Sequence, residues 1–299
     1  MRFKRLVSVI ILILILPAVL SGCGENKIKE NLAGHLTAYF FDVGQADSTL
    51  LVFPDGTSML IDAGNRNDGA HIADYIRRLG IKDLDYLVCT HPHDDHIGGM
   101  KEIFNQLNVG TVCIPLIPDE FKPTTKIYES FNKDIKNEGS RLLELTAKTV
   151  IFEKQDSNVA VVSPAENSVY SDLNNYSLTL LINCFTNTLL LMADAEEPCE
   201  RDMLKLGINL DADILKVGHH GSENASTAEF LIDASPKVAI ISSGAGNSYG
   251  HPNKGALTRL SAVGAKVYRT DTVGTIIAKC YDGGFNIETS TDIMLDGDR

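Results

Sequence analysis

The sequence predicts an α/β (α+β) fold in which two β-sheets pack face to face and helices cover both outer faces, a four-layer αββα sandwich. Strand-like runs outnumber helical runs, and the helices come singly between clusters of strands. Apolar strand-like segments also end in turns that carry several histidines, at residues 90–96 and 218–222. Each sheet must bury one face against the other sheet and one against helices, so this order of elements favours the layered architecture.

One large domain is expected over residues 35–290, a length that suits a single extended core. Its first three strands are joined by tight turns, which predicts an antiparallel start to a mixed sheet. The next helix places Ile72, Ala73 and Ile76 on one face, and Gly80 ends it. The elements expected in this half are strands at 35–41, 48–53, 58–61, 84–89 and 111–114, and helices at 69–79 and 98–107.

The middle of the chain, residues 115–157, carries weaker signals, which predict a helix at 131–138 and a strand at 148–152. Regular patterns return afterwards and continue to the end of the domain. The expected strands are 159–163, 177–183, 188–192, 212–217, 238–242, 267–270, 275–280 and 285–288, and the expected helices are 196–206, 226–234 and 254–263.

The N-terminal segment has the order of a secretory signal. Basic residues at positions 2, 4 and 5 precede an apolar run at 6–19, which is short for a membrane-spanning helix. The tetrapeptide Leu20-Ser21-Gly22-Cys23 resembles a bacterial lipobox. That resemblance implies a signal peptide at 1–22, a lipid on Cys23 and an extracytoplasmic, lipid-anchored protein. A plain transmembrane anchor or a soluble secreted protein is the alternative.

Composition limits the partners of the protein. The chain of 299 residues has a formal net charge of −12, which becomes −15 without the three basic residues of the signal. A surface this acidic does not attract nucleic acid by its general field, so a local patch or bound metals would have to do so. Residues 23–34 are expected to form a flexible tether and residues 291–299 a tail.

The cysteines show no paired spacing, which argues against a disulfide framework. Cys89, Cys113, Cys184 and Cys280 lie in apolar strand-like runs and are expected to be small core residues. His35 and His71 have no chemically suggestive neighbours and are expected at the surface.

The segment 90–96, Thr-His-Pro-His-Asp-Asp-His, is the strongest functional signal. It follows the apolar run 86–89 and places three imidazoles and two carboxylates within six residues. These groups suit zinc, and also manganese or iron. His91 and His93, two residues apart, can point the same way if the strand direction continues, whereas Asp95 and His96 lie around the turn. One cation could bind to the first pair and a second cation to the other.

Three further positions follow strands in the same way. Asp194 comes after the apolar run 189–193, where a lone carboxylate is ordinarily a turn or cap residue. His219 and His220 follow the run 214–217, between two glycines that suggest close backbone packing. His251 follows another strand and could reach the same place, or could be an ordinary loop histidine.

The pattern His-x-His-x-Asp-His resembles the signature of the metallo-β-lactamase superfamily. Together with further motifs in a characteristic order, it looks like the hydrolase domain of ComEC-type competence proteins, in a stand-alone lipoprotein form. The choline-binding phosphorylcholine esterases are a similar group. The motifs that carry the resemblance are 41–47, 60–64, 90–99, 174–178, Asp194, 216–222 and 249–252.

The resemblance implies two divalent metal ions, zinc in the first place and manganese as the alternative. His91 and His93 would hold one ion, and Asp194 would bridge the two. The ligands of the other ion would be Asp95, His96 and His219.

The resemblance also implies supporting roles. His220 would donate a proton or hydrogen bond to the substrate, although the roles of His219 and His220 are interchangeable. Lys216 and Ser222 could stabilise negative charge in the transition state, and His251 could contact the substrate. The residues expected to support the metal ligands are Asp47 and Asp62, which would orient ligating histidines, and Asn174 and Ser177, which stand where many superfamily members have a third histidine.

The expected function is therefore extracytoplasmic, metal-dependent hydrolysis of a phosphoester or phosphodiester, in nucleic acid or in a surface decoration. Two cations would lower the pKa of a water molecule and polarise the bond under attack. Hydrolysis of a β-lactam, lactone or thioester is an alternative that the same metals can perform. A catalytically silent, lipid-anchored binding protein is a third possibility, against which the full set of ligands argues.

Overall fold

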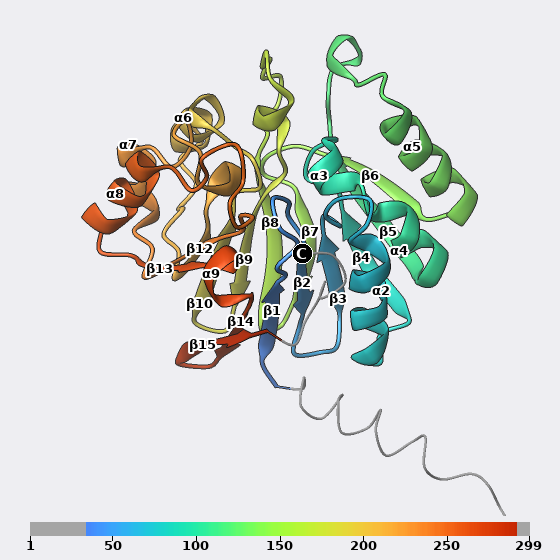
Figure 1. Cartoon of the computed structure of the whole chain (residues 1–299), viewed down its shortest axis with the longest axis horizontal. Helices are drawn as coiled ribbons and strands as arrows, with labels where there is room; N and C mark the ends of the chain where they lie inside the picture. The colour runs from blue at the N-terminus through green and yellow to red at the C-terminus, as the bar shows by residue number, and fades with distance from the viewer. Residues whose placement is uncertain (1–33, 292–299) are drawn as a thin grey trace, which may run out of the picture.

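The computed structural model describes residues 34–291, so the predicted signal peptide, the predicted lipid attachment at Cys23, and nearly all of the predicted tether and tail lie outside the described residues. Within that part, two mixed β-sheets form the centre of the molecule and helices lie on both sides (Figure 1). The predicted αββα architecture is confirmed. None of the helices in residues 34–291 has the length and apolar character needed to cross a membrane.

The first sheet has eight strands in the order β15-β14-β1-β2-β3-β4-β5-β6. Its strands are β1 (Leu36–Phe40), β2 (Thr49–Val52), β3 (Ser58–Ile61), β4 (Asp83–Val88), β5 (Asn108–Pro115), β6 (Arg141–Leu145), β14 (Thr275–Tyr281) and β15 (Gly284–Ser290). Strands β1 to β3 pair antiparallel, as the tight turns predict, and β3 to β6 pair parallel.

The second sheet has seven strands in the order β13-β12-β11-β10-β9-β8-β7. Its strands are β7 (Val150–Lys154), β8 (Ser157–Ser163), β9 (Thr179–Cys184), β10 (Asn187–Leu191), β11 (Ile214–Lys216), β12 (Val238–Ile241) and β13 (Lys266–Arg269). Strands β7 to β10 pair antiparallel, and β10 to β13 pair parallel.

Helices pack on the outer face of each sheet (Figure 1). The first sheet is covered by α2 (Gly69–Arg78), α3 (Asp94–Ile97), α4 (Met100–Gln106) and α5 (Lys126–Glu138). The second sheet is covered by α6 (Glu197–Lys205), α7 (Ala228–Ala234) and α8 (Lys254–Ala262). Short elements complete the chain: the 3₁₀ helices η1 (Asp119–Phe121), η2 (Leu173–Tyr176) and η3 (Gly218–Gly221), and the helix α9 (Thr270–Val273).

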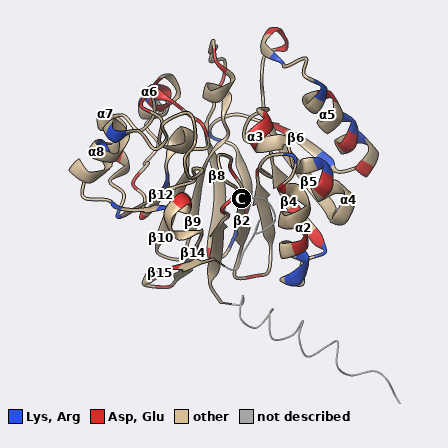
Figure 2. Ribbon diagram, in the orientation of Figure 1, with Lys and Arg blue, Asp and Glu red and all other residues tan. Residues whose placement is uncertain are grey.

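The space between the sheets is filled by apolar side chains from both. Phe53 is fully buried there and meets Phe152 of the opposite sheet edge to face, with ring centroids 4.6 Å apart. Charged residues lie mostly on the helices and loops rather than in this layer (Figure 2). The five described cysteines are buried and free, which confirms the four that were expected in the core.

Several expectations need correction. The helix predicted at 98–107 is α4, which begins only at Met100, because Gly98 and Gly99 pack so closely on backbone that no side chain fits there; the short helix α3 before them was not predicted. Helix α5 begins five residues before the predicted start at 131, because the Thr125 hydroxyl caps it. Strand β6 was not predicted, since an exposed edge strand lacks the alternating pattern. His35 is buried and packs against Tyr281, so its expected surface position is wrong, whereas His71 is exposed.

Parallel strands explain where distant residues meet. The carboxyl ends of β3 and β4 in one sheet, and of β10, β11 and β12 in the other, lie at the same edge of the sandwich. The segments that follow these ends carry the side chains predicted to bind metal: His91, His93, Asp95, His96, Asp194 and His219.

Replacing Phe53 by alanine is expected to lower the free energy of unfolding by about 3–5 kcal/mol, because it removes a fully buried ring and leaves a cavity between the sheets. Urea denaturation followed by circular dichroism measures this change. The control is Ile232→Ala, at a side chain that is 72 % exposed, which is expected to change stability by about 0.5 kcal/mol or less. Equal midpoints for the two variants would contradict the proposed packing.

Candidate metal centre

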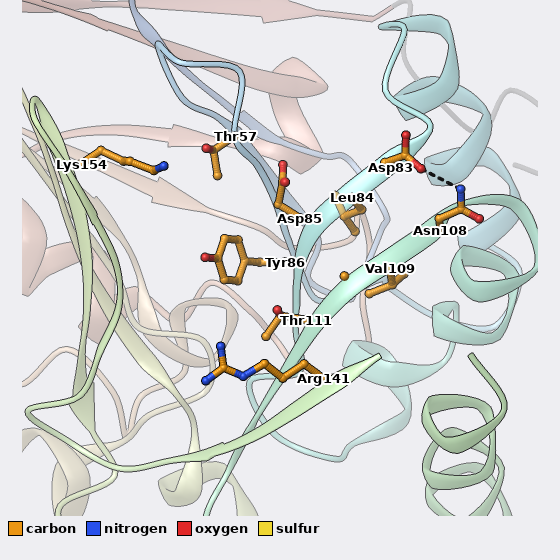
Figure 3. Close-up of a pocket in the computed structure, with 11 residues that line it drawn as sticks. Thr57, Asp83, Leu84, Asp85, Tyr86, Asn108, Val109, Thr111, Arg141 and Lys154 are labelled. Atoms are coloured by element: carbon orange, nitrogen blue, oxygen red, sulfur yellow. Dashed lines mark hydrogen bonds between the residues drawn. The ribbon is translucent and has the colours of Figure 1, made fainter. Parts of the chain in front are cut away.

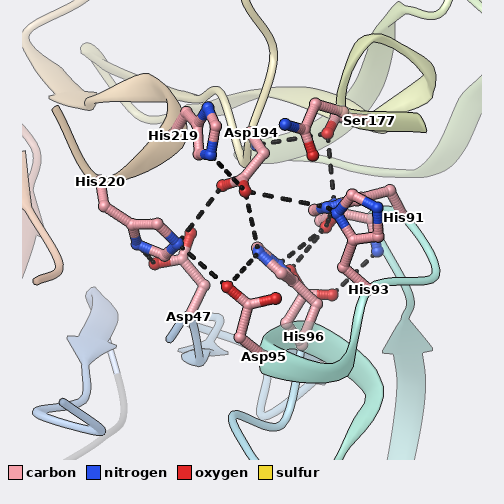
Figure 4. A network of polar contacts seen from close by, with 12 residues as sticks. Asp47, His91, His93, Asp95, His96, Ser177, Asp194, His219 and His220 are labelled. Carbon is pink, nitrogen blue, oxygen red and sulfur yellow. Dashed lines mark hydrogen bonds and ion pairs between the residues drawn. The ribbon is translucent and has the colours of Figure 1, made fainter. Parts of the chain in front are cut away.

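Five loops bring the candidate residues together at one edge of the sandwich (Figure 4). The β1–β2 loop carries Asp47, and the end of β3 carries Asp62. The end of β4 and helix α3 carry the histidine motif, the end of β10 carries Asp194, and η3 after β11 carries His219 and His220. Both sheets therefore contribute to the same cluster.

Four side chains form a compact group that could hold a metal ion: Asp95, His96, Asp194 and His220. One ligand atom from each lies within 4.8 Å of the other three. His96, Asp194 and His220 are almost completely buried, and Asp95 is partly buried. Imidazole nitrogen with carboxylate oxygen is a donor set that zinc and manganese both accept.

The unsatisfied atoms of this group show that a cation fits it. His96 Nε2, His220 Nε2 and Asp194 Oδ1 are buried and have no hydrogen-bond partner among the described residues. A buried polar atom without a partner costs roughly 1–3 kcal/mol, so such atoms are rare unless something else satisfies them. Here they converge on one point, which is the arrangement that a bound cation requires.

Asp194 is the central residue of the cluster (Figure 4). Its Oδ2 lies 3.4 Å from His96 Nε2, 3.7 Å from His219 Nε2 and 3.8 Å from His91 Nε2, while Oδ1 lies 3.7 Å from His220 Nε2. The carboxylate thus faces histidines from both sheets at once. Such a position is compatible with the bridging role that the sequence assigns to Asp194.

His91 and His93 form a second pair beside the four-residue group, with His91 Nε2 3.0 Å from His93 Nδ1. Ser177 links this pair to Asp194, since its hydroxyl lies 3.4 Å from His91 Nδ1 and accepts a hydrogen bond from the Asp194 backbone N–H. The pair shares the Asp194 carboxylate with the other group but has fewer protein ligands.

Asp62 holds His96 in position. One carboxylate oxygen accepts a hydrogen bond from His96 Nδ1 at 2.7 Å and another from the Thr90 hydroxyl at 2.6 Å. The other oxygen accepts one from the Thr90 backbone N–H. Because Nδ1 of His96 is engaged, its Nε2 faces the cluster, and this is the orienting contact predicted for Asp62.

Asp47 and Lys216 form a buried ion pair behind His220. Lys216 Nζ lies 2.8 Å from one Asp47 oxygen, and the other oxygen lies 3.6 Å from His220 Nδ1. His220 Nδ1 also donates to the Ser242 carbonyl at 3.0 Å, which directs Nε2 toward the cluster. Lys216 therefore neutralises a carboxylate below the site rather than projecting into it.

His219 differs from His220 in both exposure and partners. Its Nδ1 donates to Glu196 at 2.9 Å, and its ring is half-buried at the rim. The sequence assigns the ligand role to His219, whereas the compact group contains His220. The two consecutive residues have positive φ angles of 45° and 52°, so the backbone turns sharply and aims the rings in different directions.

The remaining candidates lie around the cluster. Asn174 is buried and its Oδ1 has no hydrogen-bond partner among the described residues. The Ser222 hydroxyl accepts from the Asn224 backbone N–H, which gives it a place in the turn after η3. His251 lies at the rim, where its ring centroid is 5.4 Å from that of His219.

Backbone strain is concentrated around the cluster. Asp62, Ala193, His219 and His220 have φ angles between 45° and 59°, a region that side-chain-bearing residues avoid. The glycines beside η3 permit its tight packing, since a Cβ on Gly218 would lie 2.6 Å from the Ala195 carbonyl oxygen. Such strain is maintained when the surrounding contacts determine the conformation, and it is common at functional sites.

The charges at the site favour a positive ion. Burial alone would raise the pKa of the Asp194 carboxyl, but the neighbouring His96 and His220 hold it well below its usual value. Burial alone would lower the pKa of His96, yet Asp194 and Asp62 raise it well above the usual value. The Asp194 carboxylate therefore stays charged and attracts a proton or a metal ion to the neighbouring histidines.

Two contributing residues were missed by the sequence analysis. Glu196 was predicted only as the first residue of the helix 196–206, but its side chain accepts a hydrogen bond from His219 Nδ1. Gln45 lies within a recognised motif, yet its contact with His251 Nδ1 at 3.4 Å joins residues 206 positions apart. No local pattern signals such a contact.

A separate cavity of about 610 Å³ lies at the opposite end of the first sheet (Figure 3). Asp83, Asn108 and Arg141 at its wall are the first residues of β4, β5 and β6, whereas the histidine motif follows the last residue of β4. None of the candidate metal ligands lines this cavity, so the candidate metal centre is at the other end of the sheet.

Replacing Asp62 by asparagine is expected to weaken zinc or manganese binding by about tenfold to a hundredfold, because His96 loses the partner that orients its ring. Competition with a chromogenic chelator measures the affinity. The control is Asp68→Asn in the same loop, whose carboxylate accepts from the Asn65 backbone N–H. Unchanged affinity in a folded Asp62→Asn variant would contradict the orienting role.

Comparison with known proteins agrees with this geometry. The model of the metallo-beta-lactamase superfamily matches residues 41–245. Among solved structures, the metallo hydrolase Igni18 of the archaeon Ignicoccus hospitalis superposes with a TM-score of 0.51 at 18 % identity, over 81 % of this chain and 98 % of that one. This likeness concerns the fold.

Among curated proteins, ComE operon protein 3 of Bacillus subtilis is 32 % identical over 79 % of this chain and 32 % of its own length. Recombination protein 2 of Haemophilus influenzae is 28 % identical over 83 % of this chain and 29 % of its own length. Competence protein ComA of Neisseria gonorrhoeae is 27 % identical over 79 % of this chain and 31 % of its own length. The chain spans about a third of the length of these relatives. It belongs to the metallo-β-lactamase superfamily and is related to these competence proteins.

Proposed function

We propose that this protein is a metal-dependent hydrolase of phosphoesters, with phosphodiesters as the preferred substrates. The observation that carries the proposal is the convergence of Asp95, His96, Asp194 and His220, in which buried ligand atoms of the last three have no hydrogen-bond partner among the described residues. We also propose two metal positions that share Asp194, the second next to His91 and His93.

The residues at and below the cluster have different roles in this proposal. A divalent cation held here would supply Lewis acidity and a water molecule that ionises near neutral pH. Asp62 and the Ser242 carbonyl keep His96 and His220 turned toward the cluster. Asp47 and Lys216 balance each other's charge below it, so that their burial adds no net charge to the site.

We assign His220 to the metal ligands and His219 to substrate contact. The roles first predicted for these two residues are thereby exchanged, which the sequence allowed. His220 belongs to the compact group, and His219 lies at the rim with its Nδ1 engaged by Glu196. That engagement leaves Nε2 of His219 available to hydrogen-bond an oxygen of the substrate.

The relatives support a phosphodiester substrate. Two of them are named for competence and recombination, processes in which DNA is handled, and the DNA backbone is a phosphodiester. The acidic net charge of this chain, −12, does not favour long-range attraction of DNA, so recognition would depend on contacts at the site itself.

The full-length chain, loaded separately with zinc and with manganese, is expected to hydrolyse bis-p-nitrophenyl phosphate and to leave a chromogenic cephalosporin intact. Plasmid DNA tests a polymeric phosphodiester. Cleavage of the cephalosporin alone would overturn the proposal in favour of a carbon-centred hydrolase, and metal binding without any turnover would favour a silent binding protein.

In the same assay, Asp194→Asn and His220→Ala are each expected to lower kcat/KM by at least about a hundredfold, because each removes a member of the buried ligand group. Chelator competition is expected to show weaker metal binding in both variants. His219→Ala should retain the metal affinity of the wild type. Loss of metal from His219→Ala, with retention in His220→Ala, would reverse the assignment.

We further propose that the signal is cleaved before Cys23 and that Cys23 carries the lipid anchor, on the basis of the tetrapeptide 20–23. In a bacterial host, the protein is expected in the membrane fraction, with a diacylglycerol mass on its N-terminal peptide. Cys23→Ser should abolish this mass, whereas the control Glu25→Gln should keep it. An unprocessed, unmodified N-terminus in the wild type would instead indicate a plain transmembrane anchor.

A further inference from the structure

We propose that the loop 244–251 presents Tyr249 as a stacking surface for a planar ring of the substrate, in particular a nucleobase attached to the phosphodiester. The inference rests on the proposed function and names the substrate group that lies next to the reacting phosphate. Tyr249 belongs to the motif 249–252, in which only His251 was predicted to contact the substrate.

Tyr249 is connected to the metal centre through a series of rings. Its ring lies nearly parallel to that of His251, with centroids 5.8 Å apart and planes at 27°. His251 in turn lies 5.4 Å from His219 and 6.4 Å from His220. A planar group stacked on the free face of Tyr249 would therefore be separated from His219 and His220 by two rings, those of Tyr249 and His251, and would lie at the rim of the metal centre.

The loop holds this arrangement in place through one side chain. Asn247 Nδ2 donates to the carbonyls of Gly244 and His251, and its Oδ1 accepts from the backbone N–H groups of Tyr249 and His251. The loop is fixed to the β1–β2 loop as well, since Gln45 Oε1 accepts from the Gly244 N–H and Gln45 Nε2 contacts His251. A ring held in advance loses little entropy when a ligand binds.

Tyr249 is also 73 % exposed. Single exposed apolar side chains are common on proteins, and exposure alone would not indicate a binding site. Tyr249 differs from an ordinary exposed side chain because it lies on a hydrogen-bonded loop at the rim of the metal centre, where its ring faces solvent. Ile232 is equally exposed at 72 %, but it lies on helix α7.

The geometry favours a planar ring over a quaternary ammonium group such as choline. Quaternary ammonium groups are bound by aromatic cages, in which several rings face the cation from different sides. Tyr249 and His251 are instead nearly parallel, so they form a stack that a further flat ring can extend. Base–aromatic stacking of this kind tolerates any base, because every base has a π-face.

The test compares three p-nitrophenyl phosphodiesters that share a leaving group: the esters of thymidine 5′-phosphate, of methyl phosphate and of phosphorylcholine. For the thymidine ester, Tyr249→Ala is expected to raise KM about tenfold with kcat within about twofold, whereas Tyr249→Phe keeps the wild-type KM. The methyl and choline esters should respond to Tyr249→Ala by less than about twofold.

Binding without turnover gives a second measurement. By calorimetry, Tyr249→Ala is expected to weaken the binding of thymidine 5′-monophosphate about tenfold and to leave inorganic phosphate binding unchanged. Ile232→Ala is the control for loss of an exposed apolar side chain and should match the wild type with every ligand.

The outcomes separate this inference from the proposed function. Hydrolysis of the esters by the wild type, with Tyr249→Ala affecting none of them or all of them equally, would overturn the stacking role and leave the hydrolase proposal intact. An effect confined to the choline ester would also overturn it, in favour of cation binding. If the metal-loaded wild type hydrolysed no ester while thymidine monophosphate still bound through Tyr249, the hydrolase proposal would fail and the stacking role would stand.

Discussion

The carboxylate of Asp194, buried between imidazoles from two different sheets, is the interaction on which the site depends. It lies within 3.4–3.8 Å of nitrogen atoms of His91, His96, His219 and His220. A buried charge must be matched by opposite charge or by a metal ion, because transfer from water is otherwise too costly. The carboxylate is therefore stable in its buried position only while the histidines stay near it. Its contacts with histidines from both sheets help to hold the two halves of the sandwich together at this edge, in addition to the apolar layer between the sheets.

Hydrogen bonds to surrounding residues fix the orientation of the histidine side chains. Asp62 engages Nδ1 of His96, the Ser242 carbonyl engages Nδ1 of His220, and Glu196 engages Nδ1 of His219. In each histidine one ring nitrogen is thus occupied by the protein; the other faces the compact group in His96 and His220 and lies at the rim in His219. The strained backbone at Asp62, Ala193, His219 and His220 is consistent with this, since the surrounding hydrogen bonds impose conformations that isolated residues would not choose.

Different parts of the strands provide stability and the candidate metal site. The apolar layer between the sheets runs the length of the sandwich, while the polar groups collect where parallel strands end. The rim of the site is built from long-range contacts such as that between Gln45 and His251, which ties the first loop of the domain to one near its end.

The sequence by itself determined the layered architecture and the histidine motif, because these depend on local periodicity and on the spacing of ligands along one segment. The role of Asp194 followed only from the resemblance to a family, because a lone carboxylate after a strand has no distinctive local pattern. Strand β6 was not predictable, since its exposed edge position depends on its neighbour β5 rather than on its own pattern. The tertiary structure alone decided that His220 joins the buried group while His219 faces the rim. Adjacent residues with the same side chain have the same local signal, and only the positive φ angles of the turn and the partners Glu196 and Ser242, brought close by folding, distinguish them.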